Sequence, residues 1–167
     1  MAGRAHTDNT TPSFELPLPG IASIAAFTKL VRINAEKGYL VSGHEVSEWT
    51  FTGVRTKNGV LTLSGPGFTG TPLSSVLDSP ADIALPLIRR LAGVFQTLSQ
   101  KIDIPVEIQP ETVFFLENNA VLFLPPGIFK KIRGMSSGSV QRDYTLLNNP
   151  YLHDFRHQTA YTIAVLL

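Results

Sequence analysis

The sequence predicts an α+β domain, in which helices and antiparallel strands share one chain. A long amphipathic helix is predicted from Pro80 to about Ile102, and hairpin turns are predicted at Asn58-Gly59 and at Glu117-Asn118-Asn119. The 167 residues suit one domain. Hydrophobic residues make up 43% and charged residues 16%, which is typical of a globular chain rather than a disordered one.

The N-terminal third predicts a lead-in, a helix and strands. Residues 1–20 carry Thr, Asn, Ser and several prolines and predict a flexible lead-in. Residues 21–34 place apolar side chains at helical spacing. Strands are expected next, the last two joined by the Asn58-Gly59 turn, over residues 39–41, 46–54 and 60–63.

The middle of the chain carries the strongest local signal. Gly65–Pro72 predicts a loop, and Leu73–Leu77 a short helix. Ser79 and Asp82 form an S-x-x-D capping box around Pro80, which suits the first helical position. The helix that follows should bury one apolar stripe, made of Ile83, Leu87, Leu91, Val94, Phe95, Leu98 and Ile102. Leu91, Phe95 and Leu98 are expected to pack against a second hairpin at residues 112–124.

The C-terminal third predicts that hairpin, then a loop and an apolar helix. Pro125-Pro126-Gly127 ends the hairpin, and residues 128–149 predict a long functional or mobile loop. Residues 154–167 become strongly apolar. Because a natural domain rarely ends on a bare apolar helix, we expect a chain that continues beyond Leu167 and an end that promotes self-association.

Composition excludes several classes of function. The net charge is +1 and no run of Lys and Arg exceeds two residues, so we expect no nucleic-acid partner. The absence of cysteine excludes disulfides, thiolate metal sites and cysteine nucleophiles. No apolar run approaches the roughly 20 residues of a membrane span, and residues 1–11 do not form a signal peptide, so a cytoplasmic protein is expected.

Three short motifs are interpreted as structural. Gly65–Gly70 matches the phosphate-binding pattern G-x-G-x-x-G, but Pro66 and Pro72 remove amide donors and only a short helix follows. Ser136 lies in a G-x-S-x-G match that a basic segment precedes, where a nucleophile elbow needs a buried strand. His153 and His157 have metal-ligand spacing, yet a third ligand and an activating Glu are missing.

One stretch carries a family resemblance. Ile104–Phe115 reads I-P-V-E-I-Q-P-E-T-V-F-F, and it shares Pro110-Glu111 and its apolar flanks with the pattern V-H-R-D-L-K-P-E-N-I-L-L. On these residues and on the order of elements, residues 60–167 resemble part of a protein kinase, from the last small-lobe strand into the large lobe. The remaining correspondences are the last small-lobe strand (60–63), the hinge (65–71), the short helix (73–77), the long helix (80–101), the D-F-G position (125–127), the A-P-E position (149–151) and the buried large-lobe helix (159–167).

The resemblance implies a site without its chemistry. Phosphoryl transfer relies on Mg²⁺, a lysine and a carboxylate. Glu107 replaces the catalytic Asp, Thr112 replaces the metal-binding Asn, and Pro125 replaces the metal-binding Asp. A glycine-rich phosphate loop and a V-A-I-K strand are also missing. We therefore expect no catalytic residues, no cofactor and no metal.

These observations lead to a partial, degenerate kinase-like fold, or pseudokinase. Its expected parts are a lead-in over 1–20, a small-lobe-like helix and strands over 21–78, and a partial large lobe over 79–167. The expected function is interaction with an unidentified protein partner, or scaffolding. Two alternatives stay open: an unrelated, complete small α+β interaction domain, and a weak enzyme that uses Glu107 or Ser136.

Overall fold

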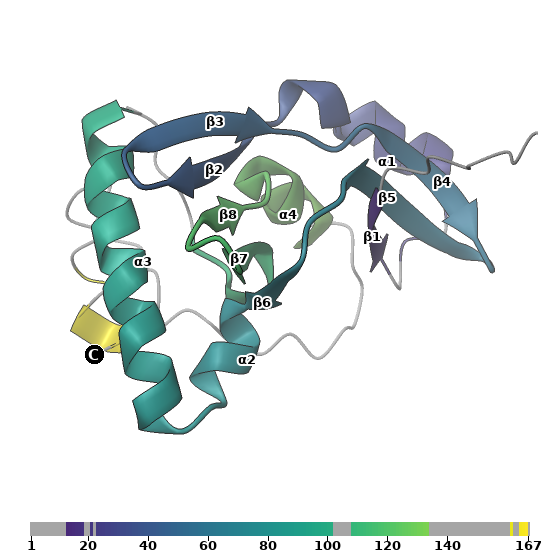
Figure 1. The fold of residues 1–167 in the computed structure, drawn as a ribbon. Coiled ribbons are helices and arrows are strands. Elements are labelled where there is room, and N and C mark those ends of the chain that lie inside the picture. Colours follow the sequence, from purple (N-terminus) through teal and green to yellow (C-terminus); the bar gives the residue numbers. More distant parts are fainter. Residues whose placement is uncertain are drawn as a thin grey trace, which may run out of the picture.

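The computed structural model describes residues 13–18, 21, 23–101, 108–133, 161 and 164–166. They form helices and antiparallel strands in mixed order, which confirms the predicted α+β class (Figure 1). The strands are β1 (Ser13–Leu18), β2 (Gly38–Ser42), β3 (Glu45–Trp49), β4 (Gly53–Lys57), β5 (Val60–Pro66), β6 (Gly70–Pro72), β7 (Val113–Leu116) and β8 (Val121–Phe123). The helical elements are α1 (Ile24–Leu30), η1 (Ile33–Ala35), α2 (Leu73–Leu77), α3 (Ala81–Lys101), η2 (Pro110–Thr112) and α4 (Pro126–Arg133).

The strands form two antiparallel sheets. The order is β1-β5-β4 in the smaller sheet and β3-β2-β8-β7-β6 in the larger one. Both predicted hairpin turns are confirmed, because Asn58, Gly59 and Asn119 have positive φ values of 51°, 77° and 61°. Asn and Gly tolerate this left-handed conformation better than other residues, which is why their positions mark these turns.

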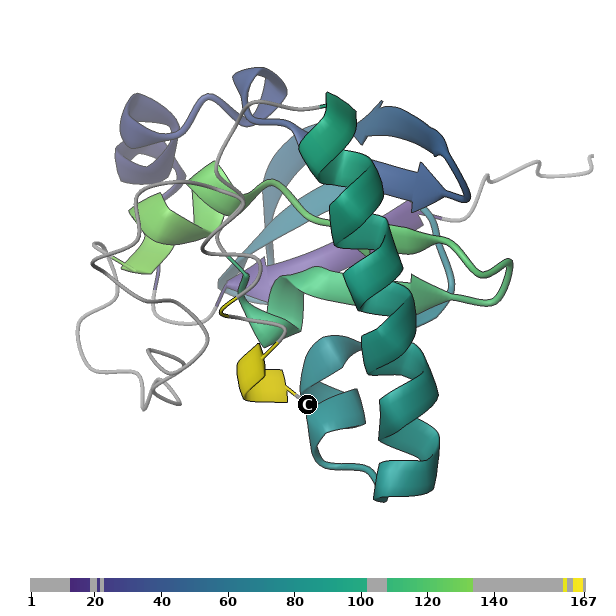
Figure 2. The same ribbon diagram turned by 90° about the vertical axis from the view of Figure 1, so that its left-hand side faces the viewer.

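The central strand β8 of the five-stranded sheet is buried on both faces. Alternate residues of β8 point to opposite sides, so Val121 and Phe123 join one hydrophobic core while Leu122 joins another. The first, here called the helix core, lies between this sheet and α3. The second, here called the junction core, is shared with the three-stranded sheet, α1 and α4. Figure 2 shows α3 lying across the strands of the larger sheet.

Helix α3 buries much of the predicted stripe. Leu91, Phe95 and Leu98 are at most 1% exposed and share the helix core with β7 and β8, and the Phe95 ring lies 5.6 Å from that of Phe123. The expected packing against the hairpin is confirmed. The start of the stripe was wrong, because Ile83 is 54% exposed and Ile88 is buried instead.

The start of α3 differs from the predicted cap. The Ser79 hydroxyl donates to the Ser75 carbonyl at the end of α2, and the Pro80 carbonyl accepts the first bonds of α3 from Ile83 and Ala84. The Ser79 amide donates to the Val76 carbonyl, so it is engaged with the preceding helix, whereas the expected S-x-x-D box requires it to donate to Asp82. A tight α2–α3 corner makes this competing bond available, and that corner cannot be read from local sequence.

The N-terminal half contains more strand than expected. Residues 13–18 of the expected lead-in form β1, which pairs with β5. The single strand expected over 46–54 divides into β3 and β4, which belong to different sheets. Strand β6 occupies the end of the expected loop Gly65–Pro72, paired with β7. Each difference arises from a long-range partner that supplies hydrogen bonds to a short segment.

Two further expectations concern the C-terminal third of the chain, where a loop and an apolar helix were predicted. Helix α4 (Pro126–Arg133) takes the start of the stretch expected to be a loop over 128–149, while residues 134–160 lie outside the described residues. Tyr161 and Ala164–Leu166 are helical, and Leu166 packs against the helix core.

The five-stranded sheet crosses the expected boundary between residues 78 and 79. Strands β2 and β3 come from the small-lobe-like segment, and β7 and β8 come from the large-lobe-like segment, yet β2 pairs directly with β8. The two segments therefore share a continuous sheet. No described helix is long and apolar enough to cross a membrane.

Candidate functional site

Thr112 and Pro125, two of the three positions at which the resemblance implied a replaced site residue, lie side by side. Thr112 ends η2, and its carbonyl accepts a 2.8 Å bond from the Leu124 amide, which brings the end of β8 and Pro125 beside it. Thr112 is 3% exposed, and its hydroxyl donates to the Gln109 carbonyl at 2.9 Å. Pro125 is also buried and carries no side-chain donor or acceptor. The pair packs the end of the hairpin and offers a metal ion no charged ligand.

The remaining predicted site residues cannot be placed. Glu107, Ser136, His153 and His157 lie outside the described residues. Within the described ranges, no three His, Cys, Asp or Glu side chains gather into a group that could hold a metal ion.

The first and last glycines of the G-x-G-x-x-G match serve close packing. A Cβ on Gly65 would lie 2.6 Å from the Trp49 ring, and one on Gly70 would lie 2.7 Å from the Phe115 carbonyl oxygen. Gly65 belongs to β5 and Gly70 to β6, so the motif spans the crossing from one sheet to the other. This arrangement agrees with the structural interpretation of the motif.

Aromatic rings gather where the two sheets meet. Phe14 of β1, Trp49 of β3, Phe68 of the β5–β6 connector and Phe114 of β7 form a group, here called the aromatic cluster. The Phe68 ring stacks on Phe14 at 4.4 Å and meets Phe114 edge-on at 5.0 Å. Trp49 is 8% exposed and lies 4.9 Å from Phe51. Trp49 and Phe114 therefore pack against other aromatic side chains of the chain.

Sequence reasoning did not single out Phe14 or Phe68. The one available signal was an aromatic residue inside a glycine-rich connector, where a large apolar side chain has no local reason to occur. Its partners come from positions 14, 49 and 114, so only the fold reveals them.

An ion pair between Glu36 and Lys131 connects the segment after η1 to α4. Glu36 accepts a hydrogen bond from Lys131 of α4, and its other carboxylate oxygen lies in the space that a Cβ on Gly127 would take. Negative charge beside the first turn of a helix is favourable because the helix dipole is positive there. Because Gly127 has no side chain, the Glu36 carboxylate can approach the start of α4 and connect the segment after η1 to this helix.

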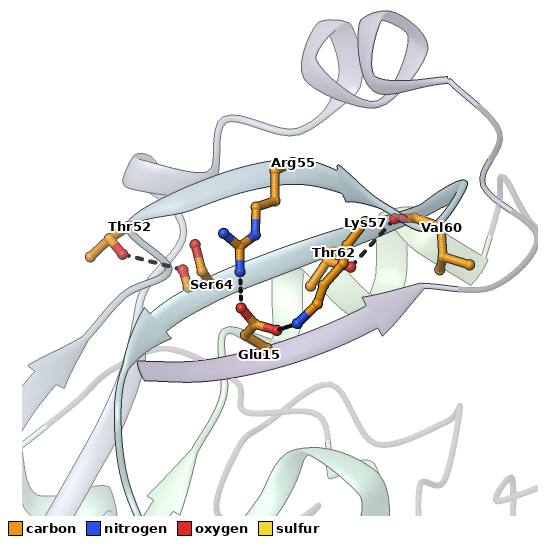
Figure 3. A network of polar contacts seen from close by, with 7 residues as sticks. All are labelled: Glu15, Thr52, Arg55, Lys57, Val60, Thr62 and Ser64. Carbon is orange, nitrogen blue, oxygen red and sulfur yellow. Dashed lines mark hydrogen bonds and ion pairs between the residues drawn. The ribbon is translucent and has the colours of Figure 1, made fainter. Parts of the chain in front are cut away.

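The outer face of the three-stranded sheet is polar (Figure 3). Glu15 of β1 accepts hydrogen bonds from both Arg55 and Lys57 of β4, across the intervening β5. Both basic side chains are more than half exposed, so solvent screens these ion pairs and their contribution to stability is small. This face carries charge of both signs and no cluster suited to catalysis.

Two titratable groups stand at the start of β2. The Glu48 carboxylate hydrogen-bonds the Lys37 ammonium and raises the pKa of that lysine. Burial raises the pKa of Tyr39, which keeps its phenol neutral within the helix core. Both groups retain their ordinary charge state at neutral pH, so neither is tuned for acid–base catalysis.

We found no match to this chain among protein-family models, curated proteins or solved structures.

Proposed function

We propose that this chain is a catalytically inactive domain that resembles part of a protein kinase and acts in protein interaction or scaffolding. The observation that carries the proposal is Pro125. It lies two residues after the end of β8, where the resemblance puts the metal-binding carboxylate, and its buried ring has no oxygen to bind a cation.

The order of elements supports the resemblance. After β5 come the connector, the short helix α2, the long helix α3, and the β7–β8 hairpin against which α3 packs. The resemblance predicts the same sequence of elements over residues 60–124. The short strand β6 also pairs with β7, which links the connector to the hairpin.

The chemistry of the described positions supports inactivity. The hydroxyl of Thr112 already donates to the Gln109 carbonyl, and its short side chain is buried. Removing one contact that stabilises developing charge typically costs about 2.7–4 kcal/mol of barrier. Replacing the Asp and Asn positions together by Pro125 and Thr112 would remove two such contacts.

A nucleotide titration tests the inactive state. We expect millimolar ATP with Mg²⁺ to leave the melting temperature unchanged, because Pro125 and Thr112 offer no metal ligand. Bound ligand at 100 times its Kd would stabilise the fold by about 2.7 kcal/mol, a shift that differential scanning fluorimetry detects. An active kinase, run in parallel, shows that the assay responds.

A clear shift with ATP and Mg²⁺ would contradict the proposal. Phosphate transfer or ester hydrolysis that disappears in Glu107→Ala or Ser136→Ala would favour the weak-enzyme alternative.

An unrelated small α+β interaction domain remains the second candidate, and one observation favours it. Strands β2 and β3 extend the sheet that contains the β7–β8 hairpin. Residues 38–49 thus join the part of the chain that the resemblance would assign to the other lobe. Interaction with another protein is the proposed role under either reading.

The interaction role has a structural basis in exposed apolar side chains. Among the described residues, the exposed large hydrophobic side chains are Leu77 of α2, Ile83 of α3 and Val165 near the C-terminus. Figure 1 shows the helical C-terminal residues beside α3, and Leu166 packs against the helix core. Self-association through this region and a cytoplasmic location are part of the proposal.

A further inference from the structure

The side chain of Phe68 occupies the space between three other aromatic rings. Its ring centroid lies 4.4 Å from that of Phe14, 5.0 Å from that of Phe114 and 6.0 Å from that of Trp49. The Phe14 ring is nearly parallel to it, at 27°, while the other two meet it edge-on. Stacked and edge-on contacts are the arrangements that aromatic quadrupoles favour.

The three surrounding rings hold their positions through contacts that do not involve Phe68. Phe14 lies 6.2 Å from Trp49 and 5.8 Å from Phe114, so the three rings also contact one another. Trp49 is fixed further by Phe51 at 4.9 Å and by the bare backbone of Gly65 beneath it. Each ring comes from a paired strand, β1, β3 or β7.

Phe68 is attached differently from the rings around it. It belongs to the connector Gly67–Thr69, which forms neither helix nor strand and links β5 to β6. Gly67 directly precedes it and Gly70 follows two residues later. Its side chain is only partly buried, so the site opens toward solvent on one side.

We propose that Phe14, Trp49 and Phe114 form a preorganised aromatic site, that Phe68 is its internal occupant, and that the site binds an uncharged planar aromatic ring when Phe68 is absent or displaced. The ligand class follows from the geometry, because the site has one stacking wall and two edge-on walls and no charged group among its rings. A ring from outside must compete with Phe68 in the intact chain. This inference does not rest on the proposed function.

Removing the occupant should open the site. In Phe68→Ala, the strand-borne rings should keep their places, leaving an apolar space of the size of a phenyl group. Enclosed apolar cavities left by removing a large side chain bind small aromatic molecules, and this partly open site would offer a similar apolar lining. Benzyl alcohol is a suitable probe, since its ring matches the Phe side chain and its hydroxyl can face the open side. Cyclohexylmethanol is the matched control, with a similar volume but no aromatic ring.

The single tryptophan makes binding visible, because Trp49 is one wall of the site and the chain contains no other. We expect its emission to shift to the red in Phe68→Ala and to return toward the wild-type wavelength as benzyl alcohol is added. The melting temperature of the variant should rise with benzyl alcohol relative to wild type. If Phe68 leaves its place less than one-tenth of the time, binding to wild type is at least about tenfold weaker.

Phe129→Ala is the control variant, because it also loses a phenyl ring but leaves the three walls and Phe68 intact; its ring lies 6.5 Å from Phe51. Phe68→Leu, which leaves part of the space filled, should bind benzyl alcohol more weakly and serves if the alanine variant does not fold. Equal responses to benzyl alcohol and cyclohexylmethanol, equal responses of the two alanine variants, or no response in either Phe68 variant would overturn the proposal. A nucleotide titration leaves this result unaffected, so the two proposals fail separately.

Discussion

At the scale of single residues, several positions in this chain require glycine because a neighbouring backbone or ring lies too close for a Cβ atom. Gly38, Gly65 and Gly70 have ordinary negative φ values, so no turn requires glycine there; a neighbouring backbone or ring does. By contrast, Asn58 and Asn119 mark turns through positive φ, and their role could be predicted from sequence. A glycine required by a distant neighbour carries no local signal, so the structural interpretation of Gly65–Gly70 could not say which neighbours require Gly65 and Gly70.

Gly38→Ala should destabilise the protein by about 1–3 kcal/mol, the usual cost of overpacking. A Cβ at this position would collide with the Phe123 carbonyl oxygen and lie 3.0 Å from the Pro125 ring, so β2 would have to move away from β8. Urea unfolding measures the change. The matched control is Gly93→Ala on the exposed side of α3, where a Cβ meets no atom within 4 Å.

That control should have the opposite sign, because replacing glycine by alanine inside a helix stabilises it by about 0.5–1 kcal/mol. Equal effects of the two substitutions would contradict the close contact between β2 at Gly38 and the Phe123 carbonyl oxygen.

At the scale of elements, periodicity predicted well which segments form helices and strands, but it predicted poorly which side chains are buried near their ends. Helix α2 matches its predicted range of residues 73–77, and the β7–β8 hairpin forms at its expected place, since turn chemistry and apolar spacing are local properties. The first turn of α3 was predicted to bury Ile83, yet Ile88 takes that role. Which side of a helix is buried near its end depends on where the sheet stops, and local spacing does not contain that information.

Leu91→Ala should lower the free energy of unfolding by about 2–5 kcal/mol, because Leu91 is fully buried in the helix core and a cavity would remain. Ile83→Ala is the control on the same helix. Its side chain is 54% exposed, so the expected change stays within about 0.5 kcal/mol. Chemical denaturation of both variants would test the comparison, and similar losses would contradict the assignment of the helix core.

At the scale of the whole molecule, the sequence predicted the α+β class but not how the sheets assemble. Strand β3 ends one sheet and β4 begins the other within a few residues, and β5 and β6 make the second crossing. The aromatic cluster fills the junction at these crossings, and no sequence pattern predicted it. Sheet partners and ring contacts depend on residues far apart in the chain, whereas the resemblance proposed for residues 60–167 depends mainly on element order. The site residues Glu107 and Ser136 stay predictions.

Self-association is the property that belongs to the whole molecule. Val165 is 42% exposed while its neighbour Leu166 packs against the helix core, so this helical segment presents an apolar side chain to solvent. Exposed apolar surface promotes association where it is contiguous, and Val165 is the large apolar side chain exposed on the described part of this segment. We therefore expect the average mass measured by light scattering to rise with protein concentration, and Val165→Asp to reduce that rise by adding a charge to the contact. Thr56→Asp adds the same charge on β4 and should leave association unchanged.

The opposite outcome is a chain that stays a monodisperse monomer at high concentration and melts in one cooperative step at about 45–65 °C. In that case the apolar segment does not mediate association, and the hypothesis of an unrelated small α+β domain gains support over the partial kinase-like fold.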